Sequence, residues 1–392
     1  MERRVYLDWN ATAPLRSEAR AAMLAALDFP GNPSSVHQEG RAAHHLVEQA
    51  REQVAALVGA EPRCVTFTSG GTEANALALA PSVGIAGAPR RDRLLVSAIE
   101  HPSVLAGGRF APDLVEQIPV TGDGIVDLSA LAERLAALAR QGPGVPMVSI
   151  MLANNETGVI QPVLQAAELV HEHGGLLHVD AVQAVGRIPV DINGLGADLL
   201  TVSGHKIGGP KGVGALIRRH REIAIAEPLI RGGGQEQGWR AGTENPAAIA
   251  GFGAAAEVAV RELAHYARNV TIVRDRLEAR LRVTNVSHVI FAEGSPRLPN
   301  TTLFAVPGVK AETAVIALDL EGVAVSSGAA CSSGKVQPSH VLAAMGVPPD
   351  IAGGAIRVSL GPDSTESDVE FFHNAWNTVL PLLLKEGRTI AA

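Results

Sequence analysis

Short apolar runs alternate with longer amphipathic runs over roughly residues 15–260, and this alternation limits the fold more than any other feature of the sequence. Two amphipathic runs, 128–140 and 161–173, carry apolar residues at helical spacing. Strands separated by helices indicate a largely parallel sheet with helices on both faces. In such sheets ligands bind at the carboxyl ends of the strands. The predicted strands are 63–68, 94–98, 147–152, 176–179, 199–203 and 213–217.

The chain length of 392 residues indicates two domains, because a domain has roughly 100–200 residues. A charged helix is predicted over 261–281, where the alternation stops. We therefore expect a large domain at 15–260 and a small α+β domain built from 1–14 and 261–392. The polar, glycine-rich stretch 231–245 is predicted to be a loop, too long for an idle connection.

Composition argues against several classes of protein. A net charge of −7 does not favour a phosphate-backbone partner, and 3% aromatic residues are few for stacking on single-stranded nucleic acid. The N-terminus lacks an apolar signal segment, and no run of 18 apolar residues predicts a membrane helix. Two cysteines cannot form a disulfide framework. We expect a cytoplasmic protein that binds neither nucleic acid nor membrane.

A small-residue turn, Thr68-Ser69-Gly70-Gly71-Thr72, follows the first predicted strand and opens a helix. Amides at a helix N-terminus bind anions, and glycine lets a phosphate approach the backbone closely. An ordinary helix cap without a ligand explains this stretch equally well. The pattern is not a Walker A loop.

An acid and a lysine end two neighbouring strands. Asp180 ends one, and Lys206 follows the other, 26 residues later. Pyridoxal phosphate requires a lysine for its Schiff base and a carboxylate on its pyridinium nitrogen. Ser203 and His205 flank the lysine and are candidate phosphate donors. Lys211 is the competing lysine, in a Gly-Pro-Lys-Gly turn.

Three further polar residues follow strands of the same sheet. His101 opens a helix after 94–98, where it could stack on a flat cofactor or move protons. A lone histidine is more often structural. Asn154 and Asn155 follow 147–152 and would face the same crevice, although asparagine there also forms turns.

The two cysteines have different surroundings. Cys331 has only small or polar neighbours, which indicates an accessible thiol that a nearby base or cation could activate. Cys64 lies on the apolar face of a predicted strand, where cysteine packs as a small hydrophobe. Without a C-x-x-C or His cluster, we expect no bound metal. Arg357, in an alternating strand, could bind a carboxylate, but in isolation an ordinary surface arginine is the favoured interpretation.

Taken together, these residues resemble the cysteine desulfurases, a family in the class V aminotransferase group of fold-type-I pyridoxal-phosphate enzymes. The likeness runs nearly from end to end, and it is the joint order of the motifs that is specific. The spacing of 26 positions from Cys331 to Arg357 resembles the long-loop subgroup. The matching blocks are Tyr6-Leu7-Asp8, Gly31-Asn32-Pro33-Ser34-Ser35, Phe67–Asn75, Glu100-His101-Pro102, Asn154–Gly158, His178-Val179-Asp180, Ser203–Lys206, Gly242–Asn245 and the Cys331 segment.

The resemblance implies a role for each candidate residue. Lys206 would carry the cofactor as a Schiff base and move protons, while Asp180 would pair with its ring nitrogen. Gln183 would contact the ring hydroxyl, and His101 would stack on the ring. Arg357 and Asn154 would bind the substrate carboxylate. The implied phosphate ligands are Gly71, Thr72, Ser203 and His205, with Thr243 from the partner subunit of a homodimer.

For Cys331 the resemblance implies attack on the sulfur of L-cysteine. The products would be L-alanine and a Cys331 persulfide, which passes its sulfur to an acceptor or iron–sulfur scaffold protein. As a persulfide, Cys331 is also the one candidate for a transient iron–sulfur ligand. The departures from the family pattern, at Trp9, Ala76, Gly208 and Ala329, remove no group with an assigned role.

Two alternatives remain open. Another class V enzyme, such as a selenocysteine lyase, aminotransferase or β-lyase, would share the lysine site without needing Cys331. A non-catalytic scaffold homologue would need neither. The sequence does not distinguish nitrogenase clusters, general iron–sulfur assembly and RNA thiolation as destinations of the sulfur.

Overall fold

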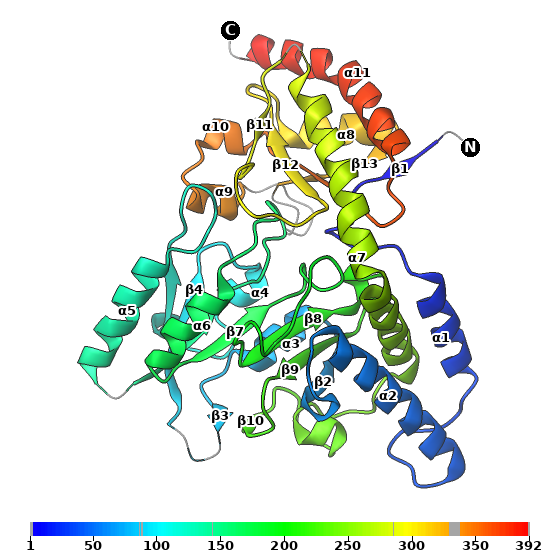
Figure 1. Cartoon of the computed structure of the whole chain (residues 1–392), viewed down its shortest axis with the longest axis vertical. Helices are drawn as coiled ribbons and strands as arrows, with labels where there is room; N and C mark the ends of the chain where they lie inside the picture. The colour runs from blue at the N-terminus through cyan, green and yellow to red at the C-terminus, as the bar shows by residue number, and fades with distance from the viewer. Residues whose placement is uncertain are drawn as a thin grey trace.

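A seven-stranded sheet forms the centre of the larger body. The structure is a computed structural model that describes residues 3–85, 87, 89–142, 144–284, 286–328 and 338–390, with side chains up to residue 385. Only β9 runs antiparallel to its neighbours, which confirms the predicted mostly parallel sheet (Figure 1). The strand order is β2 (Val65–Thr68), β9 (Gly214–Arg218), β8 (Leu199–Ser203), β7 (Leu176–Asp180), β6 (Val145–Ser149), β4 (Arg91–Ser97) and β5 (Val115–Ile118).

Both faces of this sheet are covered, because successive strand residues point to opposite sides. Leu95 and Leu200 pack into one hydrophobic cluster, while Leu94 and Leu199 pack into another. The first cluster lies beneath α1 (Ser17–Leu27), α2 (Gln38–Leu57), α5 (Leu128–Gln141), α6 (Val163–Glu172) and the first half of α7 (Pro246–Arg282). The second lies beneath α3 (Gly71–Ala78), α4 (Pro102–Leu105) and the strand pair β3 (Val83–Ile85) and β10 (Ile223–Ile225).

Several element boundaries differ from the prediction by a few residues, as in β4 and β6, and two of the differences have a clear physical reason. The strand predicted at 63–68 starts at Val65, because Pro62 opens a 3-10 turn, η1 (Pro62–Cys64). The helix predicted at 261–281 is the second half of α7, which already begins at Pro246, with Asn245 as its cap. The first half carries no charge pattern because it is buried against the sheet.

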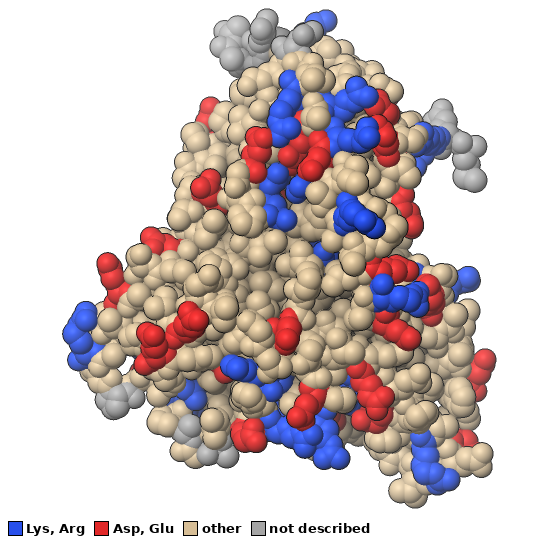
Figure 2. All heavy atoms as spheres, viewed as in Figure 1, with Lys and Arg blue, Asp and Glu red and all other residues tan. Residues whose placement is uncertain are grey.

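The smaller body contains a four-stranded antiparallel sheet in the order β11 (Val289–Ile290), β12 (Thr301–Ala305), β15 (Ile356–Ser359) and β14 (Ser326–Ser327). The first strand of the chain, β1 (Val5–Tyr6), pairs with β13 (Val323–Ala324) beside it. The second half of α7, α8 (Ala311–Leu320) and α11 (Glu366–Ile390) enclose its core. Ion pairs Arg276–Glu366 and Arg280–Glu370 join α7 to α11, where Figure 2 shows acidic and basic side chains interspersed.

A mixed cluster joins the two bodies, since Ile99 and Met151 pack with Leu303 and Val341. The helix α7 runs through both bodies, so the domain division at residue 260 stays a prediction. Within the described residues, no helix is long and apolar enough to cross a membrane, and no cluster of side chains could hold a metal ion. The remaining short elements are η2 (Pro112–Leu114), η3 (Gly204–Lys206), η4 (Gln235–Gly238), α9 (His340–Ala344) and α10 (Pro349–Ala352).

Candidate active site

A cavity lies where the carboxyl ends of the parallel strands meet the smaller body. Its empty volume is about 840 Å³, including the open mouth. Ten of the residues predicted from sequence line it, namely Gly71, Thr72, His101, Asn155, Asp180, Gln183, Ser203, His205, Lys206 and Arg357. The carboxyl-end rule for parallel sheets therefore places the cavity correctly.

Asp180 ends β7 as a buried carboxylate held by neutral donors. Asn75 Nδ2, from α3, donates to Oδ2 at 2.8 Å, and Val182 N donates to Oδ1 at 3.0 Å. Asn75 Nδ2 also lies 2.9 Å from Ser103 Oγ. No ion pair to Asp180 occurs within the described part of the chain. A buried carboxylate without a cation favours binding of a positively charged group from a ligand.

Lys206 lies in η3, directly after β8, and its ε-amine is held by the N-terminal segment. Nζ donates to the carbonyl oxygens of Asn10 at 2.5 Å and Ala11 at 2.9 Å. The competing lysine, Lys211, is in an exposed turn, as predicted. The lysine at the cavity is therefore Lys206.

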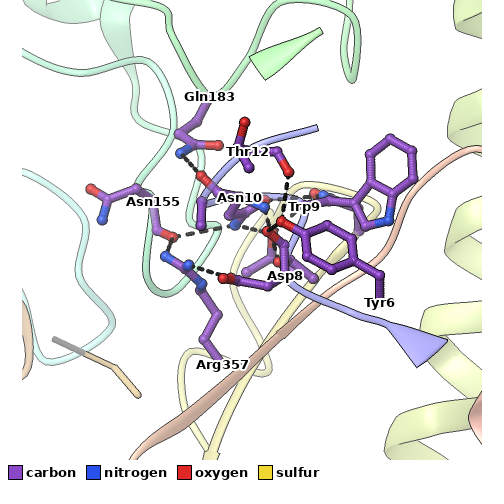
Figure 3. A network of polar contacts seen from close by, with 12 residues as sticks. Tyr6, Asp8, Trp9, Asn10, Thr12, Asn155, Gln183 and Arg357 are labelled. Atoms are coloured by element: carbon purple, nitrogen blue, oxygen red, sulfur yellow. Dashed lines mark hydrogen bonds and ion pairs between the residues drawn. The ribbon is translucent and has the colours of Figure 1, made fainter. Parts of the chain in front are cut away.

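Asn10 is a cavity residue that the sequence reasoning missed. Its side chain donates to the carbonyl of Asn155 at 3.2 Å and to Thr301 Oγ1 at 2.9 Å, and its carbonyl accepts from Gln183 Nε2 at 3.0 Å (Figure 3). It thereby connects the N-terminal segment, the large sheet and the small sheet. Its place two residues after the matched block Tyr6-Leu7-Asp8 was the only available signal, since no local pattern marks it.

The N-terminus of α3 provides an anion cradle. The amides of Gly71 and Thr72 have no acceptor within the described residues, because they belong to the first turn of the helix. A Cβ on Gly71 would lie 3.1 Å from Val182 Cγ2 and 3.5 Å from Ser203 Cβ. A side chain at position 71 would therefore crowd the residues packed beside these amides.

Two histidines of the cavity are held neutral by burial. Burial lowers the pKa of His101, more strongly than the nearby Asp180 raises it. His101 caps α4, and its Nδ1 lies 2.7 Å from Ser103 Oγ. Burial, with the positive charge of Lys206 nearby, lowers the pKa of His205 to about 4. A neutral imidazole at either position can accept a proton or a hydrogen bond at neutral pH.

Arg357 is buried, so the interpretation as an ordinary surface arginine is wrong. Nη2 donates to Asp8 Oδ1 at 2.8 Å, and Nη1 donates to the carbonyl of Asn155 at 2.9 Å (Figure 3). Nε is buried and has no hydrogen-bond partner within the described residues. Because the side chain lines the cavity, it presents a guanidinium that an anionic ligand can approach.

Asn154 does not line the cavity, contrary to its predicted place at the substrate. It is fully buried, and its Oδ1 accepts from the amides of Glu156 and Thr157 at 2.9 and 3.0 Å. Its Nδ2 donates to the carbonyl of Ile99 at 3.0 Å. The side chain therefore shapes the turn after β6, and its neighbour Asn155 lines the cavity instead.

Thr243 also lies outside this cavity in its own chain. It lines a separate hollow with Thr68 and Ser69, in the predicted loop 231–245. That loop is held by Glu236, a buried residue with positive φ of 48°. The carboxylate of Glu236 accepts a hydrogen bond from each of the two terminal nitrogens of Arg51, both at 2.8 Å. A contribution of Thr243 to a partner's cavity stays a prediction.

The two cysteines differ in what the structure describes. Cys331 lies outside the described residues, as does the rest of 329–337. Cys64 is buried in η1, and burial raises the pKa of its thiol. The predicted packing role of Cys64 is therefore confirmed.

Two buried acids behind the cavity wall were also missed. Burial raises the pKa of Glu100 to about 8 and that of Glu156 to about 7. Each directly adjoins a cavity residue, since Glu100 precedes His101 and Glu156 follows Asn155. Glu156 lies between two polar residues, so its neighbours gave no sign of burial, whereas Glu100 has one apolar neighbour, Ile99.

Comparison with known proteins finds relatives that match this chain over nearly its whole length. Residues 5–372 match the family described as aminotransferase class-V. The chain is 41% identical to the cysteine desulfurase IscS of Dictyoglomus turgidum, over 100% of this chain and 97% of that protein. It is 45% identical to a cysteine desulfurase of Cereibacter sphaeroides, over 94% of this chain and 93% of that protein. The solved NifS-like protein of Rickettsia africae superposes with a TM-score of 0.87 at 36% identity, covering 97% of this chain and 100% of that one.

Proposed function

This chain belongs to the aminotransferase class-V family, as a cysteine desulfurase that uses pyridoxal phosphate, and we propose that the cavity between its two bodies is the active site. One observation carries the proposal. Lys206, Asp180 and Arg357, far apart in sequence, line the same cavity. A lysine and an acid are the groups that hold this cofactor, at its aldehyde carbon and at its ring nitrogen. An arginine is the group that binds the carboxylate of an amino acid.

The residues present fit the cofactor. Asp180, which is buried and has no ion pair within the described residues, would pair with the protonated ring nitrogen, and Lys206 would supply the amine of the covalent link. The open amides of Gly71 and Thr72 would hold the phosphate. When bound, the cofactor withdraws electrons, which makes the Cα hydrogen acidic and the Cβ–sulfur bond of the substrate breakable. The remaining assignments are His101 to the ring face, Gln183 to the ring hydroxyl, and Ser203 and His205 to the phosphate.

Substrate orientation is assigned to Arg357. Its guanidinium is fixed by Asp8 and by the carbonyl of Asn155, and its buried Nε has no hydrogen-bond partner within the described residues. A fixed guanidinium binds a carboxylate with little loss of side-chain entropy. L-Cysteine would therefore bind with its carboxylate toward the small sheet and its amine toward Lys206.

Sulfur transfer is assigned to Cys331. Its thiolate attacks the substrate sulfur, so a sulfur–sulfur bond forms while the substrate Cβ–sulfur bond breaks. The electron pair of the broken bond remains with the carbon fragment, which takes up a proton and leaves as L-alanine. Lys206 is the group placed to move protons at the substrate carbons. The balance is one L-cysteine and one thiol in, and one L-alanine and one persulfide out.

We propose further that the enzyme is a cytoplasmic homodimer, in which Thr243 of one subunit reaches the cofactor phosphate of its partner. The persulfide would pass its sulfur to an acceptor or to an iron–sulfur scaffold protein. The relatives named as cysteine desulfurase IscS and NifS-like support a sulfur-transfer role of this kind.

The decisive experiment compares Cys331→Ala with the matched control Cys64→Ala in the cofactor-loaded enzyme. We expect Cys331→Ala to abolish sulfide and alanine production from L-cysteine while the visible absorbance of the bound cofactor persists. Cys64→Ala should retain turnover, because that thiol is buried away from the cavity. Full turnover by Cys331→Ala would favour another class V enzyme instead. A wild-type protein without cofactor absorbance would favour a scaffold homologue.

A further inference from the structure

Ser103 lines the cavity beside His101 and contacts it through two atoms. The backbone amide of Ser103 donates to His101 Nδ1, with 3.2 Å between the two nitrogens, and Ser103 Oγ lies 2.7 Å from the same Nδ1. An amide N–H can only donate, so Nδ1 must be the acceptor and carries no proton. In a neutral imidazole the proton is then on Nε2.

The side chain of Asn75 connects Ser103 to Asp180. Asn75 Nδ2 lies 2.8 Å from Asp180 Oδ2 and 2.9 Å from Ser103 Oγ, so its two hydrogens serve two acceptors. An ionised carboxylate only accepts hydrogen bonds, which requires the nitrogen of the Asn75 amide to face Asp180. Ser103 Oγ therefore accepts from Asn75, and the hydrogen of the hydroxyl is left for His101 Nδ1.

The orientation of the Asn75 amide depends on the charge of Asp180. Asn75 is 1% exposed, and its Oδ1 has no hydrogen-bond partner within the described residues. Leaving a buried amide oxygen unpaired costs stability. A flipped amide would place that oxygen against the carboxylate of Asp180, where two acceptors would repel each other. The negative charge of Asp180 therefore decides which way the hydrogen bonds from Asn75 to His101 run.

The Nε2 atom is the other edge of the His101 ring. It has no hydrogen-bond partner in the part of the chain that the structure describes, and the ring lines the cavity. His101 is the N-cap of α4, and Pro102 follows at the first helical position, so the backbone that carries the ring is also fixed. Burial lowers the pKa of His101, which keeps the ring neutral. The ring thus presents an N–H group to a ligand in the cavity.

We propose that Ser103 is a positioning residue, which with Asn75 transmits the charge of Asp180 to His101 and makes His101 a hydrogen-bond donor to the ligand through Nε2. This inference rests on the proposed function of the cavity. In this state Nε2 cannot accept a proton, so removal of a proton from the substrate is left to Lys206. The acid assigned to the ring nitrogen of the cofactor thereby also determines the polarity of the histidine assigned to the ring face.

The test reads the protonation of the His101 ring by nitrogen NMR of the cofactor-loaded enzyme with isotope-labelled histidine. Protonated and unprotonated ring nitrogens have well separated resonances, and His101→Gln identifies the signals of His101 by their loss. In the wild type at neutral pH, we expect Nδ1 at the position of an unprotonated nitrogen and Nε2 at that of a protonated one. A proton on Nδ1 would overturn the inference.

Three substitutions of Ser103 change the group that faces Nδ1. Ser103→Thr retains the hydroxyl and should keep the wild-type resonances and kcat for alanine formation. Ser103→Ala retains only the amide bond, so the Nδ1 resonance should move toward that of a free ring nitrogen and kcat should fall about fivefold, as for one lost hydrogen bond. Ser103→Asp places an acceptor at Nδ1, which should draw the proton to Nδ1 and lower kcat about a hundredfold. The visible absorbance of the bound cofactor should persist in all three.

The matched control is Ser129→Ala. Ser129 has the same helical position in α5, where its amide donates to the cap Asp127, but it does not line the cavity. This variant should leave the His101 resonances and kcat unchanged. Asn75→Ala tests the link to Asp180. It should shift the Nδ1 resonance in the wild type but not in Ser103→Ala, because the effect passes through the hydroxyl.

Equal Nδ1 resonances in Ser103→Ala and Ser103→Thr would remove the role of Ser103, and this comparison decides the matter if Ser103→Asp does not fold. An Asn75→Ala shift that is the same in both backgrounds would remove the link to Asp180. A normal kcat for Ser103→Asp with its proton on Nδ1 would show that donation by Nε2 is not needed. The proposed function fails separately, if the wild type forms no alanine from L-cysteine whatever the state of the ring.

Discussion

Replacing Glu100 by glutamine should change how the stability of the protein depends on pH. Glu100 is fully buried, and its Oε1 accepts from Ser97 Oγ at 2.6 Å and Met151 N at 2.7 Å. Its Oε2 is buried without a partner within the described residues. Burial, with the negative charge of Asp180 as a smaller cause, raises the pKa of Glu100 to about 8.

The direction follows from proton binding in the two states. The folded pKa is about 8 and the ordinary value is 4.5, so the folded protein binds the extra proton between these values. The free energy of unfolding therefore falls as pH rises through this window, by about 1.4 kcal/mol per pH unit where the states differ by a whole proton. Between pH 5.5 and 8.5, ionisation of Glu100 should lower the free energy of unfolding by about 3 kcal/mol. This is less than the full slope would give, because the folded protein itself loses the proton near pH 8.

The assay is urea unfolding of the cofactor-loaded wild type and Glu100→Gln at both pH values. Glutamine retains an oxygen for Ser97 and Met151 but cannot ionise, so about 3 kcal/mol of the wild-type decline should disappear. Glu168→Gln, on the exposed surface of α6, is the control and should keep the decline. Other titrating groups are common to all three proteins. A wild-type-to-variant difference that is equal at both pH values, within about 0.5 kcal/mol, would refute the reasoning.

Three other substitutions test the site and its support. Arg357→Lys should raise KM for L-cysteine by about tenfold or more in steady-state kinetics, because lysine cannot reproduce the fork that Asp8 and Asn155 hold. Glu236→Gln should lower the free energy of unfolding by about 3 kcal/mol in urea, because the buried guanidinium that it pairs with loses its counter-charge. Gly71→Ala should make the enzyme lose cofactor faster on dialysis, seen in visible absorbance, because its Cβ would lie 3.1 Å from Val182 Cγ2.

The sequence predicts the large sheet well because buried parallel strands are nearly continuous apolar runs. Every predicted strand corresponds to a strand of the sheet, with errors at the ends, but the edge strand β5 was not predicted, because its sequence Val-Glu-Gln-Ile is not a continuous apolar run. The helix α7 is the clearest example. Its charged half is visible as a pattern, whereas its apolar half, from Pro246, is buried by tertiary contacts that no local period reveals.

The site is predicted where chemistry is tied to a strand end, as at Asp180 and Lys206. It is missed where the role arises from contacts across the fold. Asn10 is separated by 145 residues from Asn155, and none of its neighbours in the sequence predicts that contact. That Asn155 lines the cavity while Asn154 does not has a local cause. In a tight turn, adjacent side chains point in different directions, and only the fold determines which one faces the cavity.

The two cations of the cavity are set by one short piece of chain. Lys206 is held by the carbonyls of Asn10 and Ala11, while Arg357 is held by the carboxylate of Asp8. This segment follows β1, which belongs to the smaller body, and it bridges back to Ser359 beside Arg357. The larger body supplies Lys206, so the distance between the cofactor amine and the carboxylate-binding guanidinium depends on how the bodies meet. A small change at that junction would therefore alter how the substrate fits without a substitution at either cation.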